Sequence, residues 1–213
     1  MDEQARGGRG LRCTVSPKGF EPVTRAAAHF TRYSLPWYVA GGWAVDLFLG
    51  RRTRPHQDIE VAVLRRDQRL LRNIFEGWTW SKVVPGSEGS ARTVWGEQEW
   101  LELPIHELHA REPEGELVEV LLQESDAKAW RFRREPTVSM PLSELGLRSE
   151  LGIPILRPEV VLVYKAKSPR PKDEEDFIAL LPALGDAQAT WLGEALDRCH
   201  PGHPWRTGLK LKK

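Results

Sequence analysis

The 213-residue chain has little of what several classes of protein require. It holds only two cysteines, Cys13 and Cys199, which is too few for a disulfide framework or a cysteine-type zinc site. No apolar segment of the secretory type follows the N-terminus. The longest uncharged run, residues 33–45, contains a proline and two glycines and is too short to cross a bilayer. We therefore expect a cytoplasmic protein without a membrane segment.

An excess of charge of one sign is also missing. The 31 Lys and Arg residues nearly cancel the 30 Asp and Glu residues, and the balance holds in both halves of the chain. Proteins that bind nucleic acid usually show a basic half or stripe, so this balance argues against a nucleic-acid partner. A hydrophobic fraction of 40% with 29% charged residues is typical of a folded globular chain. Composition leaves the oligomeric state open.

The order of periodic segments predicts an α/β (α+β) fold. We expect helices over residues 21–31, 43–49 and 67–75, and strands over 35–40, 58–64, 79–84, 100–108 and 117–122. Residues 125–157 read as irregular with short extended pieces, and the last third as helices over 158–166, 173–181 and 186–199. This order predicts a mixed β-sheet flanked by helices and followed by a short helical bundle.

The same pattern divides the chain into four parts. Residues 1–20, rich in Gly and Arg, read as a flexible leader, and residues 21–157 as the α/β core. Residues 158–200 form the predicted C-terminal helical part, and residues 201–213 a poorly ordered tail.

A pair of acidic residues occupies one face of a predicted strand. Asp58 and Glu60 alternate with Ile59, Val61 and Val63, whose apolar face must enter the core. Two strand steps place the acidic residues about 7 Å apart at their Cα atoms. Carboxylates this close repel each other, which raises one pKa unless a cation lies between them. Mg²⁺, held by carboxylates and substrate phosphates, is the common solution.

The preceding residues complement this pair. A helix that opens at Gly41-Gly42 lets backbone N–H groups approach an anion, and Arg51, Arg52 and Arg54 are suited to triphosphate oxygens. Taken singly, each feature has an ordinary explanation as a turn, a solvated loop or a solvated strand edge. Together, within about twenty residues, they predict a site for a metal-bound nucleoside triphosphate.

The segment GGWAVDLFLGRRTRPHQDIEV resembles the signature of the polymerase-β-like nucleotidyltransferases. It is most similar to the branch of the aminoglycoside 2''-nucleotidyltransferases and the lincosamide nucleotidyltransferases. The segment covers about a tenth of the chain, and the order of the later elements is compatible with the same family. The matching positions are Gly41, Gly42, Trp43, Leu49, Gly50, Thr53, Arg54, His56, Asp58 and Ile59.

The resemblance implies roles for these residues. Gly41 and Gly42 would cradle the triphosphate, while Asp58 and Glu60 would hold two Mg²⁺ ions. The family usually has Asp where Glu60 stands, and the additional methylene would displace the second metal. The family also implies a third carboxylate on a neighbouring strand, as metal ligand or general base. Glu119 in ELVEVLL is the candidate, with Glu102 and Glu107 in reserve, and a solvated strand edge is its ordinary explanation.

The later segment RPEVVLVYKAKSPRPKDEEDF resembles the C-terminal helices of the same family. It implies that Lys165 reaches the nucleotide phosphates, against the plainer explanation of a surface lysine. Lys172, Asp173 and Asp176 would hold the helix pair together by charge. His56 is expected to orient the acidic strand or loop by hydrogen bonding, and Trp43 to support the motif.

The other histidines give no metal prediction. His106 with His109, and His200 with His203, have ligand-like spacings. Neither pair has cysteine or acidic partners in a closed sequence pattern, so a zinc site is not expected.

Together these features imply a magnesium-dependent nucleotidyltransferase that moves a nucleoside monophosphate from an NTP to a hydroxyl of a small acceptor. An antibiotic such as an aminoglycoside or a lincosamide is the acceptor class that the resemblance suggests. Two alternatives remain open. One is a catalytically weak nucleotide-binding or regulatory relic in which Glu60 has cost the second metal. The other is an adapter that binds a partner protein through exposed tryptophans.

Overall fold

The computed structural model describes residues 18–86, 89–113, 115 and 117–211. The predicted flexible leader lies outside the described residues except for residues 18–20. Within those three residues, Phe20 is buried and packs in the core against Trp43, with ring centroids 6.3 Å apart. The core therefore begins slightly earlier in the chain than the leader prediction placed it.

A mixed sheet runs through the described residues in the order β4-β3-β5-β6-β2-β1-β10-β9. Strand β2 pairs in parallel with β6, and β1 pairs in parallel with β10; the remaining pairs are antiparallel, with β7 joining β6 to β8. The strands are β1 (Trp37–Val39), β2 (Glu60–Leu64), β3 (Thr79–Gly86), β4 (Gly89–Val94), β5 (Glu107–Arg111), β6 (Leu117–Ser125), β7 (Ala129–Arg131), β8 (Ser139–Pro141), β9 (Gly146–Arg148) and β10 (Pro154–Leu156).

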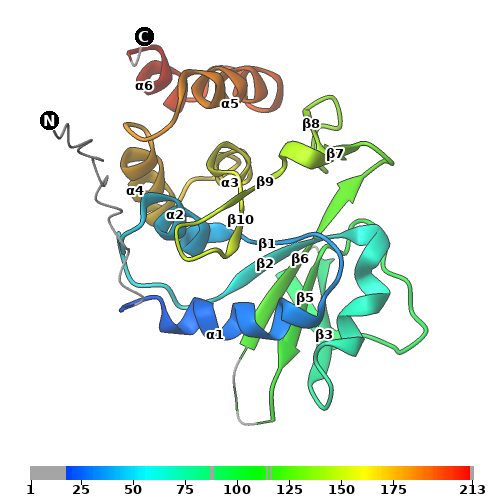
Figure 1. Ribbon diagram of the computed structural model, residues 1–213. Helices are drawn as coiled ribbons and strands as arrows, with labels where there is room; N and C mark the ends of the chain where they lie inside the picture. Colours follow the sequence, from blue (N-terminus) through cyan, green and yellow to red (C-terminus); the bar gives the residue numbers. More distant parts are fainter. Residues whose placement is uncertain (1–17, 87–88, 114, 116, 212–213) are drawn as a thin grey trace, which may run out of the picture.

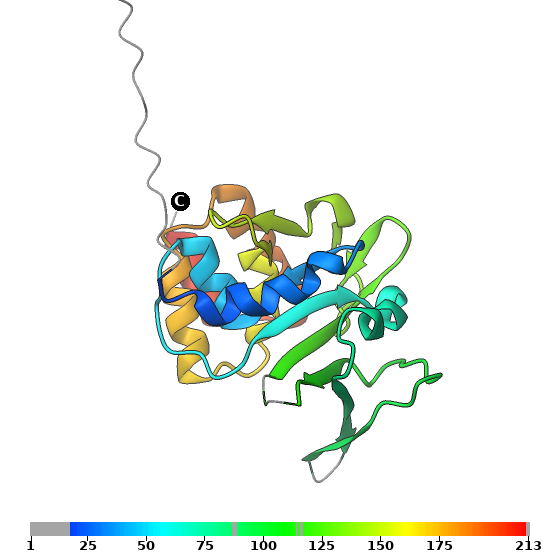
Figure 2. The same ribbon diagram turned by 60° about the horizontal axis from the view of Figure 1, so that its bottom comes forward.

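Helices cover both faces of this sheet, with α1 on one side and α3 to α6 on the other (Figure 1). In Figure 2 the β3–β4 hairpin projects away from the C-terminal helices. The helices are α1 (Glu21–His29), α2 (Gly41–Leu49), α3 (Pro158–Lys165), α4 (Pro171–Leu180), α5 (Asp186–Cys199) and α6 (Trp205–Leu211). Short 3₁₀ segments are η1 (Phe30–Arg32), η2 (Arg65–Asn73) and η3 (Leu142–Glu144).

Alternation along β2 divides the core in two. Val61 and Val63 pack with Phe30 on one face of the sheet, while Ala62 and Leu64 belong to the cluster on the other face that includes α2 and α3. All four of these β2 residues are buried. The mixed α/β architecture with a C-terminal helical bundle is thus confirmed.

The prediction of a strand over residues 100–108 was wrong. Strand β5 begins only at Glu107, and the preceding residues form a loop. The backbone of Leu101 is bound by side chains instead of by a neighbouring strand. Gln68 Oε1 accepts a hydrogen bond from its N–H, and Arg65 and Gln68 donate to its carbonyl. Strand β4 was not predicted, because its residues are exposed on both faces and show no apolar alternation.

The prediction of a poorly ordered tail was also wrong for residues 205–211, which form α6. Trp205 is buried, and its ring stacks on Phe177 of α4 with centroids 4.5 Å apart. Its indole N–H donates to Glu174 Oε2 at 2.7 Å. The feature of the sequence that could have indicated this helix is Pro204 followed by Trp205. Across the described part of the chain, no helix is both long and apolar enough to cross a membrane.

Candidate active site

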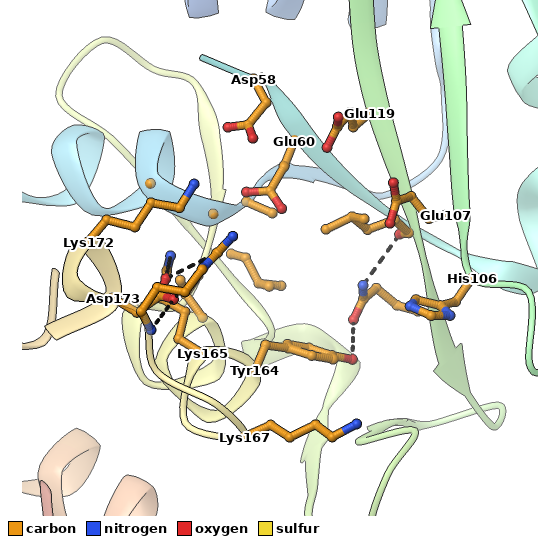
Figure 3. Close-up of a pocket in the computed structure, with 18 of the residues that line it drawn as sticks. Asp58, Glu60, His106, Glu107, Glu119, Tyr164, Lys165, Lys167, Lys172 and Asp173 are labelled. Atoms are coloured by element: carbon orange, nitrogen blue, oxygen red, sulfur yellow. Dashed lines mark hydrogen bonds and ion pairs between the residues drawn. The ribbon is translucent and has the colours of Figure 1, made fainter. Parts of the chain in front are cut away.

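The register of two parallel strands brings the predicted carboxylates together. Glu60 is the direct partner of Glu119 across β2 and β6, so both side chains lie on one face of the sheet. The ladder continues one residue earlier, where the N–H of Glu119 donates to the carbonyl of Ile59 at 2.9 Å. Asp58 precedes β2 by two residues and lines the same cavity (Figure 3). The opposite face of β6 carries the buried residues Val118, Val120 and Leu122, as the alternation predicted.

Burial, together with the charge of the neighbouring carboxylates, makes the ionisation of Glu60 and Glu119 costly. Burial, followed by the neighbouring charge of Asp58, raises the pKa of Glu60 above its ordinary value. Burial also raises the pKa of Glu119 to about 7; Glu107, Asp58 and Glu60 act in the same direction, and His109 opposes them. A bound cation would reduce the repulsion between these carboxylates, and carboxylate oxygens are ligands that Mg²⁺ prefers.

The two glycines that open α2 are required by close packing. Gly41 has a φ of +57°, and a Cβ atom placed there would overlap the Glu60 carboxylate. A Cβ at Gly42 would overlap Arg54 and His56. The N–H of Ala40 donates to the carbonyl of Glu60 at 2.8 Å, which holds the start of α2 against the acidic strand. The Gly-Gly pair therefore sets how closely the first turn of α2 approaches the carboxylates.

We expect Gly41→Ala to lower stability and to weaken nucleotide binding. The positive φ alone costs a residue with a Cβ about 1–3 kcal/mol, and displacement of Glu60 adds to that cost. Gly77→Ala is the matched control, because Gly77 has a φ of +79° and a Cβ there meets no atom within 4 Å. Thermal unfolding with and without Mg·ATP measures both effects. Equal losses in the two variants would show that the contact with Glu60 has no consequence.

A buried carboxylate that the sequence analysis missed organises the loop between α2 and β2. Asp46 is fully buried and accepts hydrogen bonds from the backbone N–H of Thr53 at 3.0 Å and from its hydroxyl at 2.5 Å. His56 Nε2 lies 2.6 Å and Arg52 Nε 3.2 Å from Asp46 Oδ2. The His56 ring packs on Trp43, with centroids 4.6 Å apart. A single acidic residue in the otherwise apolar α2 was the signal that could have identified Asp46.

Arg54 and Lys165 both line the cavity, and both are held by carboxylates of α4. Arg54 donates from Nε and Nη2 to the two oxygens of buried Asp176, each at 2.9 Å. Lys165 Nζ lies 2.8 Å from Asp173 and 3.0 Å from Asp176. Burial acts against the ionised form of Asp173, yet hydrogen bonds from Arg170 and Lys165 hold its pKa below the ordinary value. The predicted charge pairing of the helix pair is present for Asp173 and Asp176, and Lys172 lines the cavity.

The cavity between the sheet and the C-terminal helices has a volume of about 420 Å³. Its sheet side presents carboxylates from β2, β5 and β6, and its helical side presents lysines from α3 and α4 (Figure 3). An acidic wall that faces a basic wall suits a metal-bound polyphosphate, because each wall neutralises charge of the opposite sign.

The sheet register also supplies His109 with acidic partners that the sequence did not reveal. His109 Nε2 lies 2.7 Å from Glu107 Oε1 and 3.7 Å from Glu119 Oε1. Among the described residues, Glu107, His109 and Glu119 form one group that could hold a metal ion. The sequence analysis expected no acidic partners for His109 and therefore did not predict this group. Of the reserve carboxylates, Glu107 lines the cavity, whereas Glu102 is exposed in the loop before β5 and does not.

Several solved structures are similar to this chain in fold. The lincosamide antibiotic adenylyltransferase LnuA, with lincomycin bound, is similar with a TM-score of 0.51 and 15% identity, over 75% of this chain and 94% of that one. The antibiotic-resistance factor ANT(2'')-Ia gives a TM-score of 0.54 and 20% identity for its solution structure, over 84% of this chain and 91% of that one. The crystal structure of ANT(2'')-Ia with adenylyl-2''-tobramycin is similar with a TM-score of 0.52 and 18% identity, over 84% of this chain and 98% of that one.

The fold is therefore that of a nucleotidyltransferase. A search of curated protein sequences finds no match. The sequence profile described as aminoglycoside-2''-adenylyltransferase matches residues 23–180, which is most of the chain. The chain belongs to this family, and the protein is a nucleotidyltransferase enzyme.

Proposed function

We propose that the protein transfers a nucleoside monophosphate from a magnesium-bound NTP to a hydroxyl of a small acceptor, in the cytoplasm. The observation that carries this proposal is the convergence of Asp58, Glu60 and Glu119 opposite the Gly41-Gly42 helix start, in one cavity with Lys165 and Lys172. Family membership supports the reaction class.

The residues present fit a pair of magnesium ions. Asp58, Glu60 and Glu119 offer only oxygen ligands. Burial is the main cause of the raised pKa values of Glu60 and Glu119, and the neighbouring carboxylates add to it, so a cation at this place would stabilise the ionised forms. When bound, Mg²⁺ supplies neutralising charge for the α-phosphate and the pyrophosphate leaving group.

The chain's own groups position the reactants and accept the proton. The backbone N–H groups at the start of α2, with Lys172 opposite, orient the triphosphate. The acceptor oxygen bonds to the α-phosphorus as the bond to the bridging oxygen of the β-phosphate breaks, and pyrophosphate leaves. Glu119 takes the hydroxyl proton on a carboxylate oxygen, and a pKa near neutrality suits a general base.

The neighbours suggest the acceptors with which to begin. LnuA was solved with lincomycin, and ANT(2'')-Ia with adenylyl-2''-tobramycin. An antibiotic acceptor of the lincosamide or aminoglycoside type is therefore one form of the proposal. Pyrophosphate release from ATP, GTP, CTP and UTP, measured with lincomycin and tobramycin, tests it.

Magnesium-dependent nucleotide binding gives a test that needs no acceptor. We expect Mg·ATP or another Mg·NTP at about 100 times its Kd to stabilise the fold by about 2.7 kcal/mol. Asp58→Asn should abolish this stabilisation, because it removes a charged ligand from the cluster. Glu97→Gln, which alters an exposed carboxylate that does not line the cavity, should preserve it. Equal stabilisation of wild type and Asp58→Asn in thermal unfolding would remove Asp58 from the metal role.

A further inference from the structure

The cavity holds a second set of cations apart from the lysines near Glu60. Arg133, Arg134 and Lys167, here called the Arg133 group, line it together with Tyr164. In Figure 3, Lys167 lies beyond Tyr164 on the side away from Asp58. Lys165 and Lys172, in contrast, are the cations whose charge acts on Glu60. A triphosphate at the acidic cluster therefore meets the lysines and leaves the Arg133 group for another ligand.

The positive charge of the Arg133 group is not balanced within the described part of the chain. No carboxylate there lies within ion-pair distance of any of its three members, and Glu124 is paired with Arg65. Burial, and then the charge of Arg134, lower the pKa of Arg133. Burial also lowers the pKa of His106, with both arginines adding to the effect. In both cases burial is the larger cause of the lowered pKa, and the charge of the neighbouring arginines adds to it, while Glu124 opposes it at Arg133 and Glu107 opposes it at His106.

Both arginines contact Tyr164, although Arg133 is half-buried and Arg134 is exposed. Arg134 Nη1 donates to the carbonyl of Tyr164 at 3.1 Å, and the Arg133 guanidinium lies 5.7 Å from the Tyr164 ring centre. The Tyr164 hydroxyl donates to Gln123 Oε1 at 2.8 Å, and the Trp130 indole N–H donates to the same oxygen at 3.1 Å. These contacts keep the two guanidinium groups beside Tyr164, which reduces the side-chain freedom that they lose when an anion binds.

Few carboxylates of the cavity are available to pair with the ammonium groups of a polycationic acceptor. Asp58, Glu60 and Glu119 are assigned to metal and proton transfer under the proposed function. Of the remaining carboxylates, Glu107 is bound to His109, and Asp173 to Lys165 and Arg170. An acceptor with several ammonium groups would meet the Arg133 group without acidic partners to offset the repulsion.

We propose that the acceptor carries an anionic group, a carboxylate or a phosphate, which pairs with Arg133 and Arg134 while the reacting hydroxyl lies at Glu119. This inference rests on the proposed function and names the acceptor class for the same site. Two neighbouring guanidinium groups match the oxygens of either anion, and the exposed Lys167 adds a third positive charge.

A matched series of hydroxyl compounds tests the acceptor class by pyrophosphate release from Mg·ATP. Glucose, glucuronate, glucose 6-phosphate and glucosamine differ mainly in charge, and tobramycin represents a polycation. We expect kcat/KM to rise with the negative charge of the acceptor. Comparison of glucuronate with glucose 6-phosphate shows whether the site prefers a carboxylate or a phosphate.

The double variant Arg133→Gln/Arg134→Gln tests the assigned residues. Its KM for an anionic acceptor should rise by about tenfold to a hundredfold, the effect of losing one or two charge-assisted hydrogen bonds. The KM for ATP should not change, and Arg92→Gln, an exposed arginine of β4, should behave as wild type.

A binding measurement decides the question if none of these compounds is a substrate. With the nucleotide site filled by magnesium and α,β-methylene ATP, we expect inorganic phosphate to bind wild type and Arg92→Gln measurably. It should bind Arg133→Gln/Arg134→Gln at least about tenfold more weakly. Stabilisation by the nucleotide analogue reports whether the double variant is folded. If it is not, Lys167→Gln, which alters an exposed side chain, is used with the same expectation in direction.

Several outcomes would overturn the inference while leaving the nucleotidyltransferase function intact. Loss of phosphate binding when the nucleotide analogue binds would assign the Arg133 group to the NTP. An increase in the KM for ATP in the double variant would do the same. Preference for tobramycin over the anionic sugars, or absence of phosphate binding to wild type, would contradict an anionic acceptor. Failure of the proposed function is distinct, since it would appear as no Mg·NTP stabilisation in any form of the protein.

Discussion

Glu119→Gln is expected to lower kcat by about 10²–10⁴-fold, the usual effect of losing a general base. The amide has nearly the same shape as the carboxylate but cannot accept the hydroxyl proton. Glu119 is placed for this step because it is the direct register partner of Glu60 and faces the cavity. The KM for NTP should change much less than kcat. Steady-state kinetics on a working acceptor measure both parameters.

Variants of Glu102 and Glu107 test whether another carboxylate acts as the base instead of Glu119. Glu102→Gln should leave kcat unchanged, because Glu102 is exposed outside the cavity. Glu107→Gln removes the partner of His109 and should have a smaller effect than Glu119→Gln. A loss of kcat in Glu107→Gln equal to that expected for Glu119→Gln, with Glu119→Gln active, would transfer the role of base to Glu107.

Asp46→Ala is expected to destabilise the fold by about 3–5 kcal/mol, the cost of removing one partner from a buried charged network. The change leaves the His56 ring and the Thr53 N–H without their acceptor at a fully buried position, whereas the exposed Arg52 still donates to the carbonyls of Gly19 and Arg54. Chemical denaturation measures the loss. Asp46→Asn, which keeps an acceptor oxygen, should lose less.

Asp126→Ala is a matched control for burial. Asp126 also accepts two backbone hydrogen bonds, from Lys128 and Ala129, and pairs with Arg131, but it is exposed to water. Because water can replace these partners, its removal should cost much less than removal of Asp46. Similar losses for the two variants would show that Asp46 acts through its hydrogen bonds alone and not through burial.

The acidic strand illustrates what alternation alone could predict. The apolar residues Val61 and Val63 predict one buried face of β2, and this places Glu60 on the other face, which the structure also buries at Ala62 and Leu64. The same reasoning placed Glu119 opposite Val118 and Val120. What alternation could not predict is that β2 and β6 are neighbours, because strand order depends on contacts between distant segments. The structure supplies this adjacency, and the roles of the three carboxylates stay predictions.

Other parts of the site depend on pairings that leave no local pattern. Asp176 and Arg54 are 122 positions apart in the sequence, so no local pattern around either residue predicts their ion pair. Hydrogen bonds from Arg65 and Gln68 to Leu101 take the place of the strand pairing that the predicted strand at 100–108 would have required. The prediction for Arg54 considered only phosphate, whereas its Nε and Nη2 bind Asp176 and its Nη1 donates to the carbonyl of Pro55 at 3.1 Å. Lys165 likewise has carboxylate partners that its position after an apolar stripe did not indicate.

The stacking of Trp205 on Phe177 links α6 to α4, the helix whose Lys172 and Asp173 line the cavity. Phe177 follows Asp176 directly on α4, and Asp176 binds both Arg54 and Lys165. The indole also binds Glu174, one residue after Asp173. A proteolytic cut after Arg198, the last Lys or Arg before Trp205, would free α6 from the chain before it and loosen α4, whose Asp173 and Asp176 hold the basic side of the cavity. Trypsin-type clipping during purification would then inactivate the enzyme while leaving the sheet and its carboxylates folded.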